Sequence, residues 1–134
     1  MTVGDIRQRS KHARGFVDAA ELVRDFATDA GITSAPNIVA SLAVLAGIAA
    51  SDAICGLALG KRAGGESHSA AVSLLATATV NGAAYARDLQ RLVSVKTDVQ
   101  YSAMAVTDLS ADDLLRWARR LLAGMESELR GSGL

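Results

Sequence analysis

The chain has 134 residues, and its 14 Lys and Arg side chains balance 14 Asp and Glu side chains. This length is enough for one compact domain, and the zero net charge excludes a polybasic surface of the kind that binds nucleic acid non-specifically. A single cysteine excludes an internal disulfide and a cysteine-based zinc site, while abundant alanine and few aromatic residues favour helices. We therefore expect an all-α protein of the reducing cytoplasm.

The pattern of apolar residues predicts a bundle of about five helices over residues 12–130, preceded by a flexible arm over 1–11 and followed by a disordered tail over 131–134. The first helix is expected from about His12 to Ala30, where Gly31 stops it. Its apolar stripe consists of Phe16, Ala19, Ala20, Val23, Phe26 and Ala27.

The second helix is expected to begin after Ser34, as N-cap, and to end at Gly60. It is apolar nearly all round and approaches the length that spans a membrane. Asp52 lies within it, however, and a carboxylate is costly in a bilayer. A buried central helix, with no membrane contact, is therefore the favoured interpretation.

The third helix is expected to open at Glu66 or Ser67 and the fourth after Asn81. The fourth has an apolar stripe interrupted by one charge: Tyr85, Leu89, Leu92, Lys96, Val99 and Ala103. Its exposed side carries Arg87, Asp88 and Arg91. Ser110 and Asp113 resemble a capping box and predict the start of the fifth helix.

In the segment KRAGGESH, five residues separate Arg62 from His68 across the connector between the second and third helices. Cleaving a phosphodiester without a metal requires a group that moves protons near neutral pH and a fixed cation for the developing negative charge. His and Arg are suited to these two tasks. The alternative is that both are simply solvated loop residues.

Three further polar residues are candidates for the same site. Asp52 needs a cationic or hydrogen-bonding partner if it is buried, and Lys96 or Arg62 could form a structural pair with it. In a functional site Asp52 would orient Arg62 or His68, while Lys96 and Tyr101 would line the substrate cleft. Tyr101 could equally be a core residue. His12, on the basic start of the first helix, is expected to be exposed to solvent.

No cofactor or metal site is expected. The two histidines lack the HExxH spacing, and Asp112 with Asp113 is explained by a helix N-terminus. The segment GKRAGG lacks the P-loop spacing and follows a helix instead of a strand.

The stretch AGIAASDAICGLALGKRAGGESHSAAVSLL, followed by LQRLVSVKTDVQY, resembles the HEPN superfamily. These helical bundles are marked by an Arg, four to six intervening residues and a His, here Arg62 and His68. The similarity includes an apolar second helix that ends in a Gly-Lys-Arg turn, and the later pair Lys96 and Tyr101.

The resemblance implies a homodimer in which the two Arg/His motifs face each other, and a metal-independent endoribonuclease that can be the toxin of a toxin–antitoxin pair. His68 would then activate the ribose 2′-hydroxyl or protonate the leaving 5′-oxygen. Arg62 would hold the scissile phosphate. Because DNA lacks the attacking hydroxyl, the substrate would be RNA.

The sequence departs from the family pattern at two positions. The residue after the Arg is often polar in the family but is Ala63 here. A Tyr two residues past the His, which is the modified residue in one branch, is replaced by Ala70, and this excludes regulation by tyrosine modification there. Ala63 and the neutral charge favour an alternative function: a non-catalytic, HEPN-like dimer that binds nucleotide, nucleic acid or a partner protein.

Overall fold

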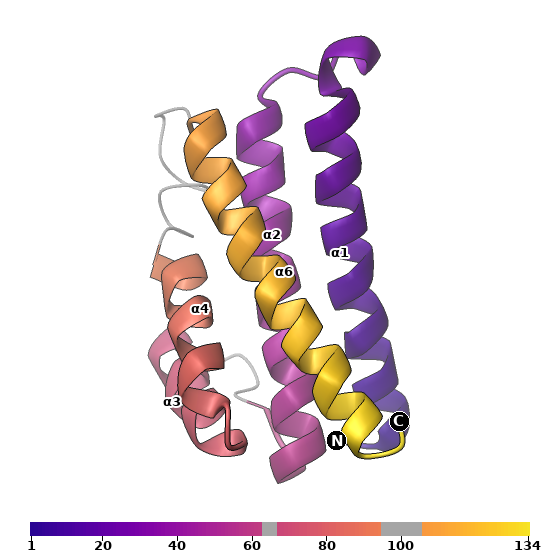
Figure 1. Cartoon of the computed structure of the whole chain (residues 1–134), viewed down its shortest axis with the longest axis vertical. Helices are drawn as coiled ribbons and strands as arrows, with labels where there is room; N and C mark the ends of the chain where they lie inside the picture. Colours follow the sequence, from indigo (N-terminus) through magenta and orange to yellow (C-terminus); the bar gives the residue numbers. More distant parts are fainter. Residues whose placement is uncertain (63–66, 95–105) are drawn as a thin grey trace.

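The computed structural model describes residues 1–62, 67–94 and 106–134, which form five α-helices and no β-strand. The predicted all-α helical bundle is therefore confirmed. Three long helices lie side by side, and two short helices form a hairpin against them (Figure 1). The helices are α1 (Val3–Ala30), α2 (Ala35–Leu59), α3 (His68–Ala78), α4 (Gly82–Ser94) and α6 (Asp108–Gly131).

Helix α2 is the centre of the bundle, as its apolar sequence predicts. Thirteen of its 25 residues are buried, and it contacts each of the other four helices. Alanine and glycine dominate this buried surface, so neighbouring helices can approach closely. By length and composition α2 could cross a membrane. The core helix of a bundle can have the same length and composition, and 67% of the most apolar 18-residue stretch of α2 is buried in the bundle.

Helix α1 begins at Val3, so the prediction of a flexible arm over 1–11 and a helix start near His12 is wrong. Thr2 and Asp5 form a capping box: the Thr2 hydroxyl accepts a hydrogen bond from the Asp5 N–H at 3.0 Å, and the Asp5 carboxylate accepts one from the Thr2 N–H at 2.9 Å. Ile6, one of the few apolar residues in this polar segment, is buried in the core. The cap and this one anchor hold the first turns as helix.

The start of α1 packs against the end of α2 at Gly56. A Cβ atom at this position would lie 2.6 Å from the Met1 sulfur and 3.1 Å from Cγ1 of Ile6. The absence of a side chain at Gly56 therefore allows the two helix ends to touch. This contact brings the first turns of α1 alongside the last turns of α2, where the candidate site lies.

The buried stripe of α1 differs from the predicted one at its far end. Phe26 was expected in the core, yet 54% of it is exposed. The residues of α1 that are buried are Ile6, Ala13, Val17, Ala20 and Ala27. This stripe is made of smaller side chains because α1 lies close to α2.

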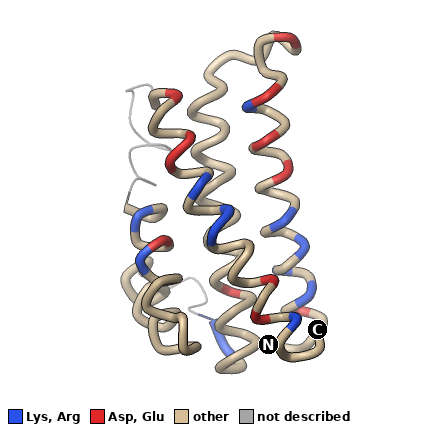
Figure 2. Tube along the Cα trace, viewed as in Figure 1, with Lys and Arg blue, Asp and Glu red and all other residues tan. Residues whose placement is uncertain are grey.

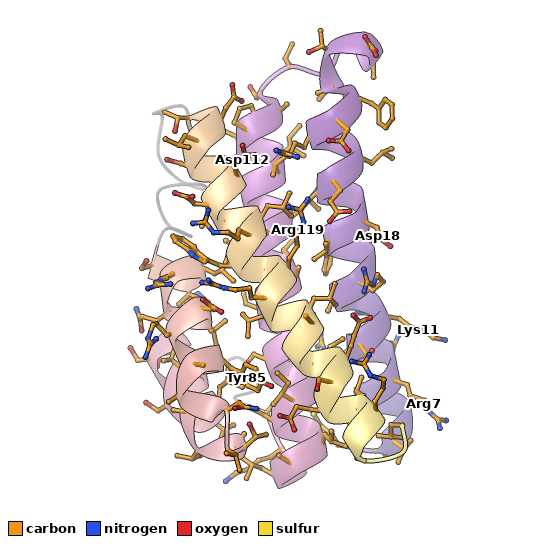
Figure 3. All side chains as sticks on the ribbon, in the orientation of Figure 1. Arg7, Lys11, Asp18, Tyr85, Asp112 and Arg119 are labelled. Atoms are coloured by element: carbon orange, nitrogen blue, oxygen red, sulfur yellow. The ribbon has the colours of Figure 1, made fainter. Side chains whose placement is uncertain are left out.

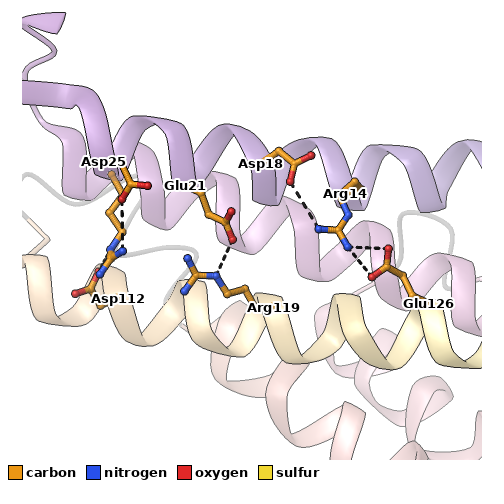
Figure 4. A network of polar contacts seen from close by, with 8 residues as sticks. Arg14, Asp18, Glu21, Asp25, Asp112, Arg119 and Glu126 are labelled. Atoms are coloured by element: carbon orange, nitrogen blue, oxygen red, sulfur yellow. Dashed lines mark hydrogen bonds and ion pairs between the residues drawn. The ribbon is translucent and has the colours of Figure 1, made fainter. Parts of the chain in front are cut away.

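Helix α6 runs antiparallel to α1, and ion pairs join them along their length (Figure 4). Arginine and carboxylate groups approach within 2.6–2.7 Å in three cross-helix pairs: Arg14–Glu126, Arg119–Glu21 and Arg24–Asp112. Residues later in α1 pair with residues earlier in α6, as expected for antiparallel helices. We call these three pairs the α1–α6 ladder.

The helix ends follow the predicted glycines. Gly31 and Gly60 adopt left-handed conformations, with φ of 71° and 72°, and end α1 and α2 where expected. Ser67 caps α3, as one of the two predicted starts. Ser34 occupies the N-cap of α2, but its side chain makes no capping hydrogen bond.

Two local predictions in the second half of the chain are wrong. Helix α6 begins at Asp108, because the Thr107 hydroxyl accepts a hydrogen bond from the Ser110 N–H at 3.1 Å and so acts as the N-cap in place of Ser110. Asp88 was assigned to the exposed side of α4 but is only 8% exposed. Arg120 of α6 covers it, with a contact of 2.6 Å.

The chain closes in an ordered turn after α6, where a disordered tail was expected. The Leu134 N–H donates to the Leu129 carbonyl at 2.9 Å, and Gly133 adopts a φ of 82°. Such a turn satisfies carbonyl groups that a helix end leaves free.

Candidate functional site

Arg62, the first of the predicted site residues, lies three residues beyond the end of α2. The left-handed turn at Gly60 redirects the chain there, so that Arg62 faces back toward its own helix. Its guanidinium Nη1 approaches Oδ2 of Asp52 at 3.4 Å. The structure therefore brings Arg62 together with Asp52, as one of the two predicted pairings.

Asp52 has a second arginine partner that the sequence did not reveal. Nε of Arg9, on α1, lies 3.7 Å from the same carboxylate oxygen that Arg62 contacts. The Asp52 side chain is only 13% exposed, whereas those of Arg9 and Arg62 are 34% and 40% exposed. One shielded carboxylate thus holds two half-exposed guanidiniums.

The electrostatics of Asp52 reflect two opposing effects. Burial raises the pKa of this carboxyl above its usual value, because desolvation disfavours the charged form. The positive charges of Arg9 and Arg62 lower the pKa by less than burial raises it. Asp52 thus positions the two arginines at some cost in desolvation.

A polar pocket of about 350 Å³ opens beside these two arginines, between the start of α1 and the end of α2. The residues that line it are Met1, Asp5, Gln8, Arg9, His12 and Arg62. Four of them share one face of α1, because 5, 8, 9 and 12 follow the three-to-four spacing of a helix. His12 is exposed, as predicted, but it also forms part of the pocket wall.

Among the described residues that line this pocket, Asp5 is the only one with a carboxylate, and it is engaged in the capping box. Hydrogen bonds from the Thr2 backbone and side chain, followed by smaller effects that include the charge of Arg62, hold the pKa of Asp5 below its usual value. The Asp5 carboxylate is therefore ionised and directed toward the helix N-terminus.

His68, the second predicted catalytic residue, is the first residue of α3 and is exposed. The Ser67 hydroxyl accepts a hydrogen bond from the Ala70 N–H at 3.2 Å and fixes this helix start. Within residues 1–62, 67–94 and 106–134, no hydrogen bond or ion pair joins His68 to Arg62. Ala63, Lys96 and Tyr101 lie outside the described residues.

Arg9 and His12 are the residues that sequence reasoning missed. Both belong to the segment that was assigned to a flexible arm or to the exposed start of the first helix. One signal could have found them: Thr2 and Asp5 have the spacing of a capping box, which would have extended the helix to Val3 and placed residues 5, 8, 9 and 12 on one face.

Comparison with family models, curated proteins and solved structures finds no significant match to this chain. Within the described parts of the chain, no group of three or more His, Cys, Asp or Glu side chains is placed to hold a metal ion.

Proposed function

We propose that this protein is a metal-independent endoribonuclease of the HEPN type, with its site centred on Arg62 and His68. One observation carries the proposal: Asp52 holds Arg62 at the edge of a polar pocket, with 40% of the arginine side chain exposed. An arginine that a carboxylate holds in place, and that is still partly exposed to solvent, can bind a phosphate without first reorganising. His68 opens the next described helix and remains accessible to solvent.

The reaction needs only groups that the chain and RNA supply. His68 takes the proton of the ribose 2′-hydroxyl as that oxygen attacks phosphorus, and the bond from phosphorus to the 5′-oxygen breaks. The leaving 5′-oxygen takes a proton from water, and the protonated His68 returns its proton to solvent, so the products are a 2′,3′-cyclic phosphate and a 5′-hydroxyl. Arg62 binds the non-bridging phosphate oxygens and stabilises the charge that accumulates on them.

The experiment is to incubate the purified protein with mixed RNA in EDTA. We expect cleavage that persists without metal, leaves DNA intact, and is lost in Arg62→Ala and His68→Ala. Arg116→Ala is the control, because Arg116 is an exposed arginine of α6 that also pairs with a carboxylate, Asp113, but does not line the pocket. Circular dichroism should show the same helix content for all variants.

A second candidate function is a non-catalytic dimeric protein that binds nucleotide, nucleic acid or a partner protein. The same pocket supports it, since two arginines beside a carboxylate can bind an anion without any chemistry following. Wild-type protein that leaves RNA intact at micromolar concentration would favour this second function over the nuclease.

The remaining parts of the proposal concern partners and location. We propose a cytoplasmic homodimer in which the sites of two subunits meet, and a toxin that a cognate antitoxin protein silences. Light scattering tests the dimer, and a monomer at the working concentration would remove the composite site. Induced expression tests the toxin: growth should stop with the wild type and continue with His68→Ala.

A further inference from the structure

The polar face at the start of α1 is not used by the proposed cleavage chemistry, although it borders Arg62. Gln8, Arg9 and His12 project from this face into the same pocket of about 350 Å³. Each can donate at least one hydrogen bond, and Arg9 carries a permanent charge. The pocket therefore gathers hydrogen-bond donors from two helices that are distant in sequence.

The two arginines keep donors available for a ligand. Arg62 uses Nη1 to contact Asp52, and Arg9 uses Nε. Among the described residues, the other nitrogens of these two guanidiniums have no hydrogen-bond or ion-pair partner. A guanidinium has five N–H donors in a planar fork, so each arginine can still bind an oxyanion while Asp52 holds it.

The nearby carboxylates do not block an anion. Asp52 is shielded from solvent and is not among the residues that line the pocket. It therefore contacts the two arginines without facing the pocket itself. Asp5 does line the pocket, but its carboxylate accepts the hydrogen bond from Thr2. The described residues that line the pocket therefore bring the two positive charges of Arg9 and Arg62 against the one negative charge of Asp5.

We propose that this pocket is a phosphate-binding site in which Arg9 and Arg62 bind one phosphate group and His12 contacts it from the α1 side. Because both arginines contact a single oxygen of Asp52, their forks converge closely enough for one tetrahedral anion to reach both. The assignment of this phosphate to an RNA strand rests on the proposed ribonuclease function. The proposal that the pocket binds a phosphate does not depend on that function.

The distribution of charge along α1 agrees with this assignment. The first half of the helix carries Arg7, Arg9, Lys11 and Arg14 against one carboxylate, whereas the second half carries Arg24 against four: Asp18, Glu21, Asp25 and Asp29. Figure 2 shows the basic half at the end of the bundle where α2 terminates. An approaching phosphate is thus attracted to the end that holds the pocket.

The test measures binding without cleavage. Full-length protein is titrated in EDTA with a fluorescent single-stranded 2′-deoxy oligonucleotide, which has phosphates but no attacking hydroxyl, and with inorganic phosphate as competitor. Arg9→Gln and His12→Gln should each weaken oligonucleotide binding, Arg9→Gln by about tenfold, as expected for loss of hydrogen bonds to a charged group. Arg9→Lys, which keeps the charge but not the fork, should fall between the wild type and Arg9→Gln.

Arg7→Gln and Lys11→Gln are the matched controls. Both residues lie on α1 within a turn of the pocket, and both point away from the bundle (Figure 3). They should bind as the wild type does. Equal losses in these controls would mean that binding depends only on total charge and would overturn the pocket, as would unchanged affinity in Arg9→Gln and His12→Gln.

The competitor separates two sources of phosphate. If inorganic phosphate displaces the oligonucleotide, the pocket accepts a free phosphate; if it does not, the site requires the ester of a strand. Both results support the site, whereas failure of the wild type to bind either probe overturns it. The nuclease is tested independently: loss of RNA cleavage in Arg62→Ala and His68→Ala with normal binding in Arg9→Gln rejects only the present proposal, and binding without any cleavage rejects only the nuclease.

Discussion

Asp52 is the residue on which the candidate site depends. It is a carboxylate in a helix of apolar residues, shielded from solvent and placed between Arg9 and Arg62. Burial disfavours its charge more than the two arginines favour it, so the pKa of Asp52 is raised in the folded protein. Its presence is therefore better explained by the positions it imposes on the arginines than by a gain in stability.

Asp52→Asn should change how stability depends on pH. Because the pKa of Asp52 lies above its usual value of 3.8 only in the folded state, the folded chain binds this proton more tightly than the unfolded chain does. The free energy of unfolding of the wild type should therefore decrease, relative to the variant, as the pH rises through 3.8 to the raised pKa. Urea unfolding at several pH values measures this difference.

The direction of this change in stability depends on the balance between the burial of Asp52 and the positive charges of Arg9 and Arg62. If the free energy of unfolding of the wild type instead increased relative to Asp52→Asn over that pH range, the attraction of Arg9 and Arg62 would outweigh burial. Comparison with the variant cancels the contribution of Asp5, whose pKa is lowered and whose effect lies below 3.8.

Part of the site could be predicted from single residues. Asp52 stood out because one carboxylate interrupts a long apolar run, and Arg62 because it lies in the polar connector that leads to His68. Arg9 and His12 do not stand out as single residues, and the capping-box spacing of Thr2 and Asp5 would only have placed them on one face of a helix. Their place in the pocket depends on the packing of α1 against Gly56, which is a long-range contact.

At the scale of helices, two glycines should respond in opposite ways to substitution by alanine. At Gly82, the first residue of α4, a Cβ atom would lie 2.5 Å from the Ala76 carbonyl oxygen and 2.7 Å from that of Leu75. These are backbone atoms that cannot move aside easily. Gly82→Ala should therefore destabilise the fold by about 1–3 kcal/mol, as overpacking does.

Gly15→Ala is the matched control for that substitution. Gly15 is an exposed residue in the middle of α1, and apart from its chain neighbours and the backbone of its own helix no atom lies within 4 Å of a Cβ placed there. Alanine should stabilise the helix by about 0.5–1 kcal/mol, because glycine loses more conformational freedom on folding. Thermal unfolding of both variants checks the pair, and a Gly82→Ala protein as stable as the wild type would contradict the close contact.

The α1–α6 ladder should contribute little to stability for each of its pairs. Glu21 and Arg119 approach at 2.7 Å, but both side chains are more than a third exposed, so solvent screens their attraction. A double-mutant cycle with Glu21→Gln and Arg119→Gln should give a coupling energy of about 0.2–1 kcal/mol that declines in 1 M salt. A coupling that salt leaves unchanged would show that the pair is not screened.

Helix ends were predicted well where a single residue decides them. Gly31 and Gly60 end α1 and α2 because glycine adopts a positive φ without strain, and Ser67 caps α3. The start of α1 was missed because two apolar residues, Val3 and Ile6, are too few to establish a helical periodicity. Asp88 was misplaced because its burial depends on Arg120, which reaches it from another helix.

For the molecule as a whole, the zero net charge limits how nucleic acid can bind. Basic residues predominate in the first half of α1 and at the adjoining end of α2, acidic residues predominate in the second half of α1, and both signs occur on α4 and α6 (Figure 2). Attraction of a strand should therefore come from a few contacts at the pocket, and an extended electrostatic surface is not available.

The salt dependence of oligonucleotide binding tests this conclusion. Each phosphate neutralised on a single strand contributes about −0.7 to the slope of log affinity against log salt, so two or three contacts predict a slope of about −1.5 to −2. Arg9→Gln should make the slope shallower by about 0.7, while Arg7→Gln should leave it unchanged. Anisotropy titrations from low to physiological salt measure all three. A slope steeper than about −5 would require many more cations than the pocket holds, and the strand would then have to bind along α1 beyond the pocket.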